Sequence, residues 1–302
     1  MSVLSALACR IVNKRGADLR RPRGTGGPVK QVRTRGRRTA RRRAWLTRTV
    51  WVAGPLAFII TVAAALGPAI TAAPAAISES ALVTGGSPAG TRAVGALFSM
   101  SGGQIGAHFC TASVVDSPAG NLLVTAAHCV QGYSDIAPAG LAFVPGYNGT
   151  APYGIWTVTR IFVDSAWAST ADPDDDVAFL TVSGPGGNTR IENVTGAERL
   201  GIGQSSTEVV RVTGYPDTQD QPISCGTRTR AFSPRQIEFD CDNYTEGTSG
   251  SPFLIGVDPV TGDGTVIGVI GGYQQGGASA DVSYSATFGQ NVRTLYDTAA
   301  GR

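Results

Sequence analysis

Short apolar runs separated by turn-forming residues fill the chain from about residue 82 onward. Runs rich in valine, isoleucine, threonine and phenylalanine are typical of strands, and the glycines, prolines and asparagines between them mark turns. The runs cover 94–98, 113–115, 122–124, 157–163, 177–182, 207–212, 236–239, 253–255 and 265–270. Many short strands with frequent turns predict an all-β sandwich or a pair of barrels.

The last segment of the chain has a different period. Within 288–297, the apolar residues Val292, Leu295 and Tyr296 are spaced at i, i+3 and i+4. This spacing places them on one face of a helix. We therefore expect a short C-terminal helix packed on the β-structure.

Charge divides the chain into a basic leader and an acidic body. Residues 1–48 carry 15 Lys and Arg and one acidic residue, whereas the rest carries 10 Arg and 21 acidic residues. The net charge of +3 therefore describes neither part. A block of arginines such as 33–43 is typical of nucleic-acid-binding tails, which gives one interpretation of a retained leader.

The segment after the leader favours export instead. No charged residue occurs over 49–78, and Ala73-Pro74-Ala75 resembles a signal-peptide cleavage site. A basic region, an apolar region and a small-residue site predict an export signal over 49–76, cut after Ala75 or Ala76. The alternative is an uncleaved membrane anchor, because the segment is just long enough to span a bilayer. On either interpretation the body lies outside the cytoplasm.

The cysteines agree with export. Four of the five lie in the body, an even number that suits disulfides, and three pairings of Cys110, Cys129, Cys225 and Cys241 are open. A metal site is the rival interpretation, but the body has no C-x-x-C spacing and the chain has two histidines. We expect no metal and no cofactor.

Three short segments carry the groups that nucleophilic catalysis requires. Gly247-Thr248-Ser249-Gly250 holds a serine between glycines, which let the backbone turn sharply and point N–H groups into a site. A serine hydroxyl needs a base to take its proton and a carboxylate to orient that base. Thr125-Ala126-Ala127-His128-Cys129 supplies a histidine, and the acidic cluster 172–176 lies between the two motifs.

In this order, the three segments resemble the signature motifs of the chymotrypsin-like serine proteases over about residues 83–297. Gly-Thr-Ser-Gly-Ser-Pro is most similar to the bacterial branch that contains the glutamyl endopeptidases. The resemblance implies two six-stranded β-barrels with the active site between them. It places a protease domain at 77–302, with an N-terminal barrel over about 82–185 and a C-terminal barrel over about 186–302. It also implies a Cys110–Cys129 disulfide, which leaves Cys225–Cys241 as the second pair.

The same resemblance implies a role for each motif residue. His128 is the general base, and Ser249 is the nucleophile. Asp176 is the orienting carboxylate because it directly precedes the apolar run 177–180. The backbone N–H groups of Gly247 and Ser249 are expected to form the oxyanion hole. Ser251 is the rival nucleophile, but it precedes a proline.

Within the acidic cluster, Asp175 is the second choice for the orienting role. We expect Asp172, Asp174 and Asp175 to form a solvated turn, since aspartate and proline favour turns.

Specificity is the least constrained feature. Counting back from Ser249 places the base of the primary pocket near Asn243 and Tyr244. The pocket wall is expected at Ile270, Gly271, Gly272 and Tyr273. Glutamate-preferring relatives use a histidine in that wall, and Ile270 stands near its place. We therefore do not expect glutamate preference, and a neutral or apolar side chain is the default.

Thr248 departs from the trypsin-like digestive enzymes, where the resemblance places an aspartate that pairs with a newly cut N-terminal amine. Threonine cannot form that ion pair. We expect a secreted, monomeric endopeptidase that acts on proteins or peptides, binds no nucleic acid and needs no such new N-terminus. The alternative is a catalytically silent protease homologue that acts as an extracellular binding module.

Overall fold

The computed structural model describes residues 91–133 and 140–301. The predicted leader (1–48), the apolar segment (49–76) and the cleavage position near 75–76 lie outside these residues. Among the described residues, no helix has the length and apolar character needed to cross a membrane.

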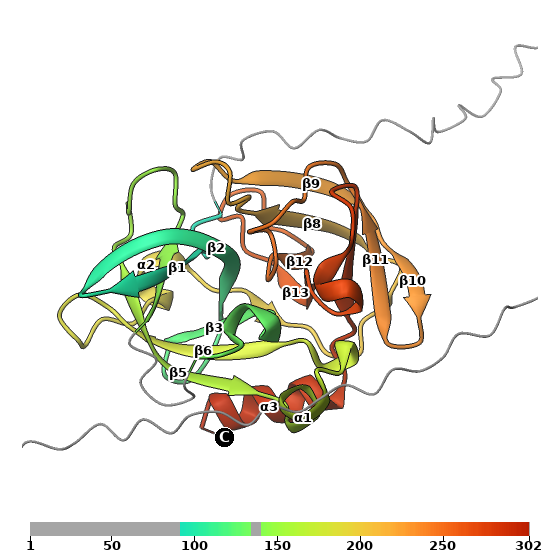
Figure 1. Cartoon of the computed structure of the whole chain (residues 1–302), viewed down its shortest axis with the longest axis horizontal. Helices are drawn as coiled ribbons and strands as arrows, with labels where there is room; N and C mark the ends of the chain where they lie inside the picture. The colour runs from blue at the N-terminus through green and yellow to red at the C-terminus, as the bar shows by residue number, and fades with distance from the viewer. Residues whose placement is uncertain (1–90, 134–139, 302) are drawn as a thin grey trace, which may run out of the picture. The chain divides into compact units, whose positions relative to one another are not determined.

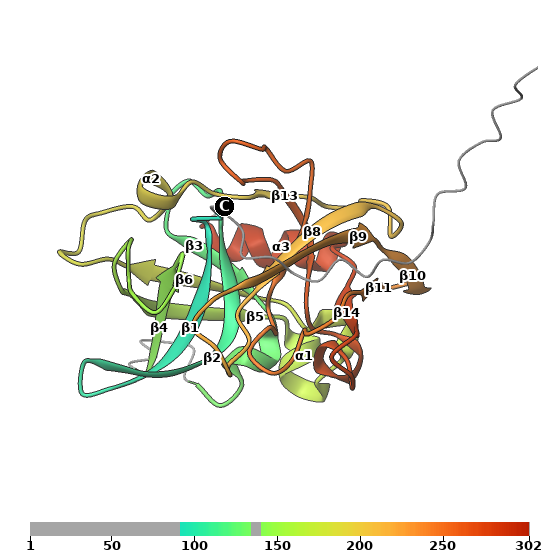
Figure 2. The ribbon, with the colours of Figure 1, turned by 90° about the horizontal axis from the view of Figure 1, so that it is seen from above.

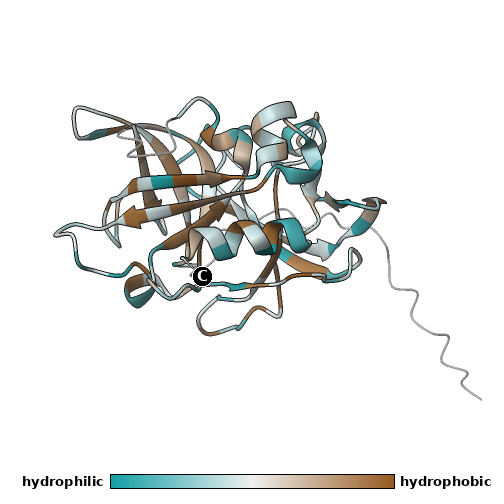
Figure 3. Cartoon of the chain, turned by 90° about the horizontal axis from the view of Figure 1, so that it is seen from below, coloured by the Kyte–Doolittle hydropathy of each residue, from teal (hydrophilic) through white to brown (hydrophobic). Residues whose placement is uncertain are grey.

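The first half of the described chain is a closed barrel of antiparallel strands in the order β1-β2-β3-β6-β5-β4 (Figure 1). Its strands are β1 (Val94–Ser101), β2 (Gln104–Val115), β3 (Leu122–Thr125), β4 (Leu141–Pro145), β5 (Trp156–Val163) and β6 (Ala178–Ser183). Apolar side chains of alternate strand positions fill the interior, and Leu97, Val114, Phe143 and Phe179 are fully buried. Figure 3 shows the resulting apolar colour along these strands.

The second half contains two sheets. One has the order β7-β13-β12-β8-β9 and the other β10-β11-β14. The strands are β7 (Arg199–Leu200), β8 (Val209–Gly214), β9 (Ile223–Arg228), β10 (Arg230–Ser233), β11 (Gln236–Asp240), β12 (Pro252–Ile255), β13 (Thr265–Val269) and β14 (Val282–Ala286). Figure 2 shows both sheets from above.

The two sheets are joined by isolated hydrogen bonds, among them the bond from the Gly271 N–H to the Tyr284 carbonyl at 2.9 Å, and by a disulfide, rather than by a continuous backbone ladder. The Ser285 hydroxyl on β14 accepts a hydrogen bond of 2.9 Å from the Val269 N–H on β13. Cys225 on β9 is bonded to Cys241, which follows β11. Both sheets share one apolar core that includes Val212, Phe239 and Phe253. The all-β prediction is confirmed, but the hydrogen-bonded ladder closes only in the first half.

Short helices lie at the strand ends. They are η1 (Ala127–Val130), α1 (Ser165–Thr170), η2 (Pro173–Asp175), α2 (Glu192–Thr195), η3 (Tyr273–Gly276) and α3 (Gln290–Ala299), of which the η helices are 3₁₀. The predicted C-terminal helix is thus confirmed as α3. Val292 and Tyr296 are buried on its inner face, and the Tyr296 ring packs 5.6 Å from Phe179 of the first barrel.

The two halves share an apolar interior. Leu254, Val266 and Val269 of the second half belong to the same core cluster as the first barrel. The last strand of that barrel ends at Ser183 and the next strand begins at Arg199. Residues 184–198 therefore connect the last strand of the barrel to the first strand of the second half, and the boundary near 185 stays a prediction.

Candidate active site

Strand register brings His128 and Asp176 together. β3 and β6 are antiparallel neighbours, and Thr125 at the end of β3 pairs with Ala178 at the start of β6. His128 lies just beyond Thr125 in η1, and Asp176 lies just before Ala178, after η2. Two groups 48 residues apart in sequence therefore meet at one edge of the barrel.

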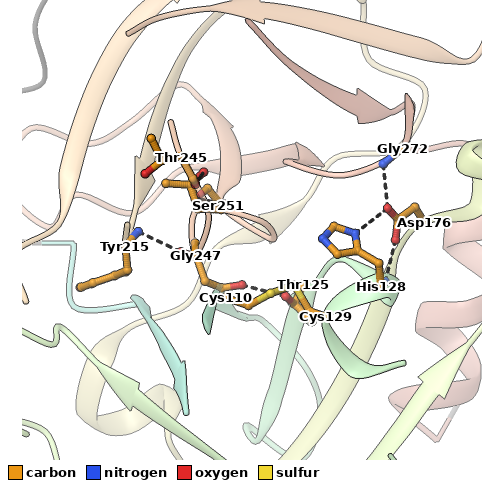
Figure 4. Close-up of a disulfide and its surroundings, with 12 residues drawn as sticks. Cys110, Thr125, His128, Cys129, Asp176, Tyr215, Thr245, Gly247, Ser251 and Gly272 are labelled. Carbon is orange, nitrogen blue, oxygen red and sulfur yellow. Dashed lines mark hydrogen bonds and ion pairs between the residues drawn. A yellow bond between two sulfur atoms is a disulfide. The ribbon is translucent and has the colours of Figure 1, made fainter. Parts of the chain in front are cut away.

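The Asp176 carboxylate is fully buried and receives three hydrogen bonds (Figure 4). One oxygen, Oδ1, accepts from the His128 backbone N–H at 2.9 Å. The other, Oδ2, lies 2.8 Å from His128 Nδ1 and accepts from the Gly272 N–H at 2.8 Å. These donors supply the hydrogen bonds that a buried charge requires.

This contact fixes the form of the imidazole. A carboxylate can only accept a hydrogen bond, so His128 Nδ1 carries the proton and donates a hydrogen bond to Asp176. The other ring nitrogen, Nε2, therefore has a free lone pair. The His128 side chain is 12% exposed and lines a cavity of about 420 Å³. Nε2 is therefore the ring nitrogen available to accept a proton from a group in that cavity.

Ser249 lines the same cavity from the second half. Its carbonyl accepts a 2.7 Å hydrogen bond from the Thr111 N–H of β2, and the next N–H, of Gly250, donates to the Ile270 carbonyl at 2.7 Å. Gly250 has φ 85°, and a Cβ there would overlap the Thr111 carbonyl and the Thr125 hydroxyl. Only glycine fits this close approach.

The rival serine does not face the cavity. Ser251 is fully buried, and its hydroxyl donates to the Thr248 carbonyl at 2.5 Å. The Thr248 hydroxyl in turn donates to the Thr245 carbonyl at 2.7 Å.

The two N–H groups that are expected to form the oxyanion hole are not used in backbone hydrogen bonds with other described residues. Within 91–133 and 140–301, the N–H groups of Gly247 and Ser249 donate no backbone hydrogen bond. By contrast, those of Thr248, Gly250 and Ser251 do. Gly247 has φ 90°, and a Cβ there would overlap backbone atoms of residues 215 and 217, so the turn requires glycine.

The predicted pocket residues separate into two groups. Tyr244 and Ile270 line the cavity, whereas Asn243, Gly271, Gly272 and Tyr273 do not. The wall is formed instead by the turn that follows them, and the cavity is lined by Phe109, Cys110, His128, Cys129, Tyr244, Thr245, Glu246, Thr248, Ser249, Ile270 and residues 274–280.

The residues outside the cavity have other surroundings. Asn243 occupies a left-handed turn position, with φ 73°, and borders a separate hollow. Gly271 lies against the Asp176 carboxylate, and Gly272 donates to it. Tyr273 is 39% exposed and packs with Phe232 and Tyr284 at ring distances of 4.9 and 5.2 Å.

Both predicted disulfides are present. Cys110 on β2 is bonded to Cys129 in η1, which ties the turn that carries His128 to the neighbouring strand. Cys225–Cys241 is the second pair. A disulfide stabilises mainly by restricting the unfolded chain.

The expected solvated aspartate turn is wrong for Asp175, which is 6% exposed. Its carboxylate accepts from Asn291 of α3 at 2.5 Å and from Arg235 at 3.2 Å. Both partners lie far away in sequence, so composition alone could not reveal this burial.

Sequence reasoning also missed a buried amide beside the same turn. Gln236 is 3% exposed, and its Nε2 donates to the Pro173 carbonyl at 3.0 Å and to Asp174 at 2.7 Å. Its Oε1 accepts from the Tyr273 N–H at 3.1 Å. One side chain thus joins the turn before Asp176 to the segment whose Gly272 N–H contacts Asp176.

Comparison with known proteins yields a family match and several similar structures. A family model described as Trypsin matches residues 83–288. The protease Anisep from Arthrobacter nicotinovorans is 25% identical, with a TM-score of 0.59 over 72% of this chain and 99% of that one. A thermostable serine protease, AL20, from an extremophilic microorganism is 22% identical, with a TM-score of 0.58 over 70% and 98%. A Glu endopeptidase is 19% identical, with a TM-score of 0.53 over 71% and 93%.

One curated relative is the extracellular metalloprotease of Bacillus subtilis (strain 168), 28% identical over 112 residues. This match covers 35% of the present chain, and the chain spans about a third of the length of that relative.

The name of that relative implies a bound metal ion, but the side chains of the described residues do not suit such a site. Among the described residues, Cys110, His128 and Cys129 form the one cluster of three potential ligands. The two cysteines are joined in a disulfide and offer no thiolate, and His128 Nδ1 is directed at Asp176.

Proposed function

The chain belongs to the trypsin family, and on that premise we propose that it is a serine endopeptidase with Ser249 as nucleophile, His128 as base and Asp176 as orienting carboxylate. The expected resemblance to chymotrypsin-like serine proteases is confirmed by the family match and the similar structures. One observation carries the assignment of roles. The buried Asp176 fixes the imidazole so that Nε2 is free in the cavity that Ser249 also lines.

In the proposed reaction, Ser249 Oγ attacks the carbonyl carbon of a peptide bond while His128 Nε2 accepts its proton. The carbonyl oxygen becomes negative and is bound by the N–H groups of Gly247 and Ser249. The C–N bond then breaks, the imidazolium returns the proton to the leaving amine, and an acyl-enzyme remains. Water attacks the ester with His128 again as base, which releases the acid and restores the hydroxyl.

The cavity favours a substrate side chain without charge. Its lining includes the amides of Gln274 and Gln275 and the apolar Tyr244 and Ile270, and the one acidic side chain, Glu246, is exposed. The phenol of Tyr244 does not reach outward, because it donates to the Val212 carbonyl at 2.8 Å. Among the residues that the structure describes, neither a buried anion for lysine or arginine nor a second histidine for glutamate lines this cavity.

Export is part of the proposal. The basic leader, the uncharged segment 49–78 and the two body disulfides agree with a protein that works outside the cytoplasm. One relative is named as extracellular. We propose cleavage near 75–76, a monomeric enzyme, and protein or peptide substrates.

A fluorophosphonate probe tests the nucleophile. We expect covalent labelling of the secreted body at Ser249 and loss of labelling in Ser249→Ala, with Ser251→Ala as a matched control that still labels. A folded body that neither labels nor cleaves a peptide library would overturn the proposal in favour of a silent binding homologue. N-terminal sequencing of secreted protein tests export, since retention of residues 1–48 would contradict it.

A further inference from the structure

Thr111 is a fully buried residue of β2, and its N–H and hydroxyl both donate to carbonyls of the loop that carries Ser249. Its N–H donates to the Ser249 carbonyl at 2.7 Å. Its hydroxyl donates to the Gly247 carbonyl at 3.0 Å and accepts from the Tyr215 N–H at 2.9 Å. Its own carbonyl accepts from the Thr125 hydroxyl at 2.7 Å.

Three of these four bonds run between the two halves of the molecule. Thr111 and Thr125 are in strands of the first barrel, whereas Tyr215, Gly247 and Ser249 come after the connection to the second half. The first barrel therefore provides a fixed anchor for a loop of the second half.

Two hydrogen bonds fix the peptide planes that flank Gly247, and one of the two comes from Thr111. In the plane between residues 246 and 247, the Glu246 carbonyl accepts from the Asp217 N–H at 2.9 Å. Because a trans peptide directs C=O and N–H to opposite sides, the Gly247 N–H points away from Asp217. The following plane is held by the Thr111 hydroxyl on the Gly247 carbonyl. A loss of either bond would free a glycine that has no Cβ to restrict its rotation.

Thr248 explains why such an anchor is needed. Its hydroxyl is engaged locally with the Thr245 carbonyl, and it carries no charge that could attract an N-terminal amine. The constraint on the loop must therefore come from elsewhere, and the Thr111 hydroxyl is a buried, fully bonded group that reaches the Gly247 carbonyl.

We infer that Thr111 is a positioning residue that holds the Gly247–Ser249 backbone, and with it the oxyanion-binding N–H groups, without a newly cut N-terminus. This inference rests on the proposed peptidase function. In the proposed reaction Thr111 contacts no substrate atom and acts only through the backbone of the loop that it holds.

The test compares Thr111→Val, which removes the hydroxyl at similar size, with Thr111→Ser, which retains it. Loss of an oxyanion donor costs about 10²–10³ in rate, so a misdirected donor in Thr111→Val should lower kcat about 10- to 100-fold. KM should change less than about threefold, because the ground-state carbonyl depends little on this donor. Affinity for a peptide aldehyde, whose adduct carries the oxyanion, should fall in parallel with kcat/KM. Thr111→Ser should restore most of both.

Thr159→Val is the matched control, since it also removes a hydroxyl from the first barrel, where Thr159 donates to the Thr181 carbonyl at 3.1 Å. It should leave kcat unchanged. Each kcat is calculated per mole of folded protein, and the folded fraction is measured by circular dichroism at 10 °C. The inference is overturned if folded Thr111→Val keeps the wild-type kcat, or if Thr111→Ser loses as much as Thr111→Val. Failure of the peptidase proposal itself would appear separately, as a wild-type protein that neither cleaves nor labels.

Discussion

Glu198 is a fully buried carboxyl at the junction of the two halves. Its backbone is hydrogen-bonded to β2 and the residue after it. The Glu198 N–H donates to the Val114 carbonyl at 2.8 Å, and the Glu198 carbonyl accepts from the Asp116 N–H at 2.9 Å. Its side-chain Oε2 accepts from the Gly264 N–H in the loop between β12 and β13. The other oxygen, Oε1, has no partner among the described residues. Burial of the Glu198 side chain raises its pKa to about 8. The nearby negative charge of Asp263 also raises this pKa, whereas the hydrogen bond from the Gly264 N–H and the positive charge of Arg199 lower it.

The pKa of Glu198 determines how stability varies with pH. The unfolded carboxyl loses its proton near its ordinary pKa of 4.5, whereas the folded one keeps it to about 8. Between these values unfolding releases a proton, so stability is highest at the acid end and falls as pH rises. Each pH unit in this window is worth roughly 1.4 kcal/mol, so the step from pH 6 to pH 8 costs about 2 kcal/mol. For a body of this size, that loss lowers Tm by roughly 4–8 °C.

Glu198→Gln provides the perturbation, because glutamine keeps the acceptor for Gly264 and cannot ionise. Ser249→Ala is introduced into both proteins so that self-digestion does not distort the comparison. Urea unfolding is then measured at half-unit steps from pH 5 to pH 8.5. The difference in unfolding free energy between the two proteins isolates Glu198, because other titrating groups are common to both.

We expect the unfolding free energy of the glutamine variant minus that of its parent to increase by about 2 kcal/mol from pH 6 to pH 8, because only the parent is destabilised as Glu198 ionises. Parallel curves over this range would refute the reasoning, since they would mean that Glu198 binds the same number of protons folded and unfolded. A variant that loses stability relative to its parent as pH rises would refute it as well, because the folded parent would then bind fewer protons than the unfolded one.

Two further predictions concern the supports of the candidate site. Gln236→Met removes the amide that joins the Asp176 turn to Tyr273, so we expect kcat on a peptide substrate to fall roughly tenfold with little change in KM; an unchanged kcat would contradict this. Gly250→Ala places a Cβ against Thr111 and Thr125 at φ 85°, so urea unfolding should show a loss of about 2 kcal/mol or more and fluorophosphonate labelling should slow. A fully stable, fast-labelling variant would exclude the close approach.

The side chains of the His128–Asp176 contact could be predicted because each belongs to a motif with local meaning. An aspartate that precedes an apolar strand and a histidine that follows one will meet if the two strands are antiparallel neighbours, and β3 and β6 are. The strand runs themselves follow from β-branched residues between turn signals. Both features depend on a few adjacent residues, and are therefore visible in a single sequence.

The cavity wall could not be predicted in this way. Gapless counting from Ser249 pointed to Asn243 and Tyr244, of which Tyr244 lines the cavity, and of the expected wall at 270–273 only Ile270 does. The turn that follows the expected wall depends on Gln274 and Gln275, which adopt left-handed conformations with φ 52° and 56°. Non-glycine residues seldom occupy this region, so no sequence pattern predicted a reversal of the chain there.

Asp175 was misjudged for a different reason. Its neighbours in sequence, Asp172 to Asp174, are typical of an exposed turn, and its own burial comes from Arg235 and Asn291. A charged residue is buried when partners at long range compensate its charge and hydrogen bonds. Only the assembled fold supplies such partners.

Orientation within the candidate site is supplied across the junction of the two halves. Asp176 belongs to the first barrel, yet its Oδ2 is held by the Gly272 N–H of the second half. Ser249 belongs to the second half, yet its carbonyl is held by the Thr111 N–H of the first barrel. Each half thus contributes a residue of the candidate site and holds in place a residue that the other half contributes. Local motifs can specify which side chains are present, but their alignment requires that the two halves pack in one register, which the shared apolar interior and α3 enforce.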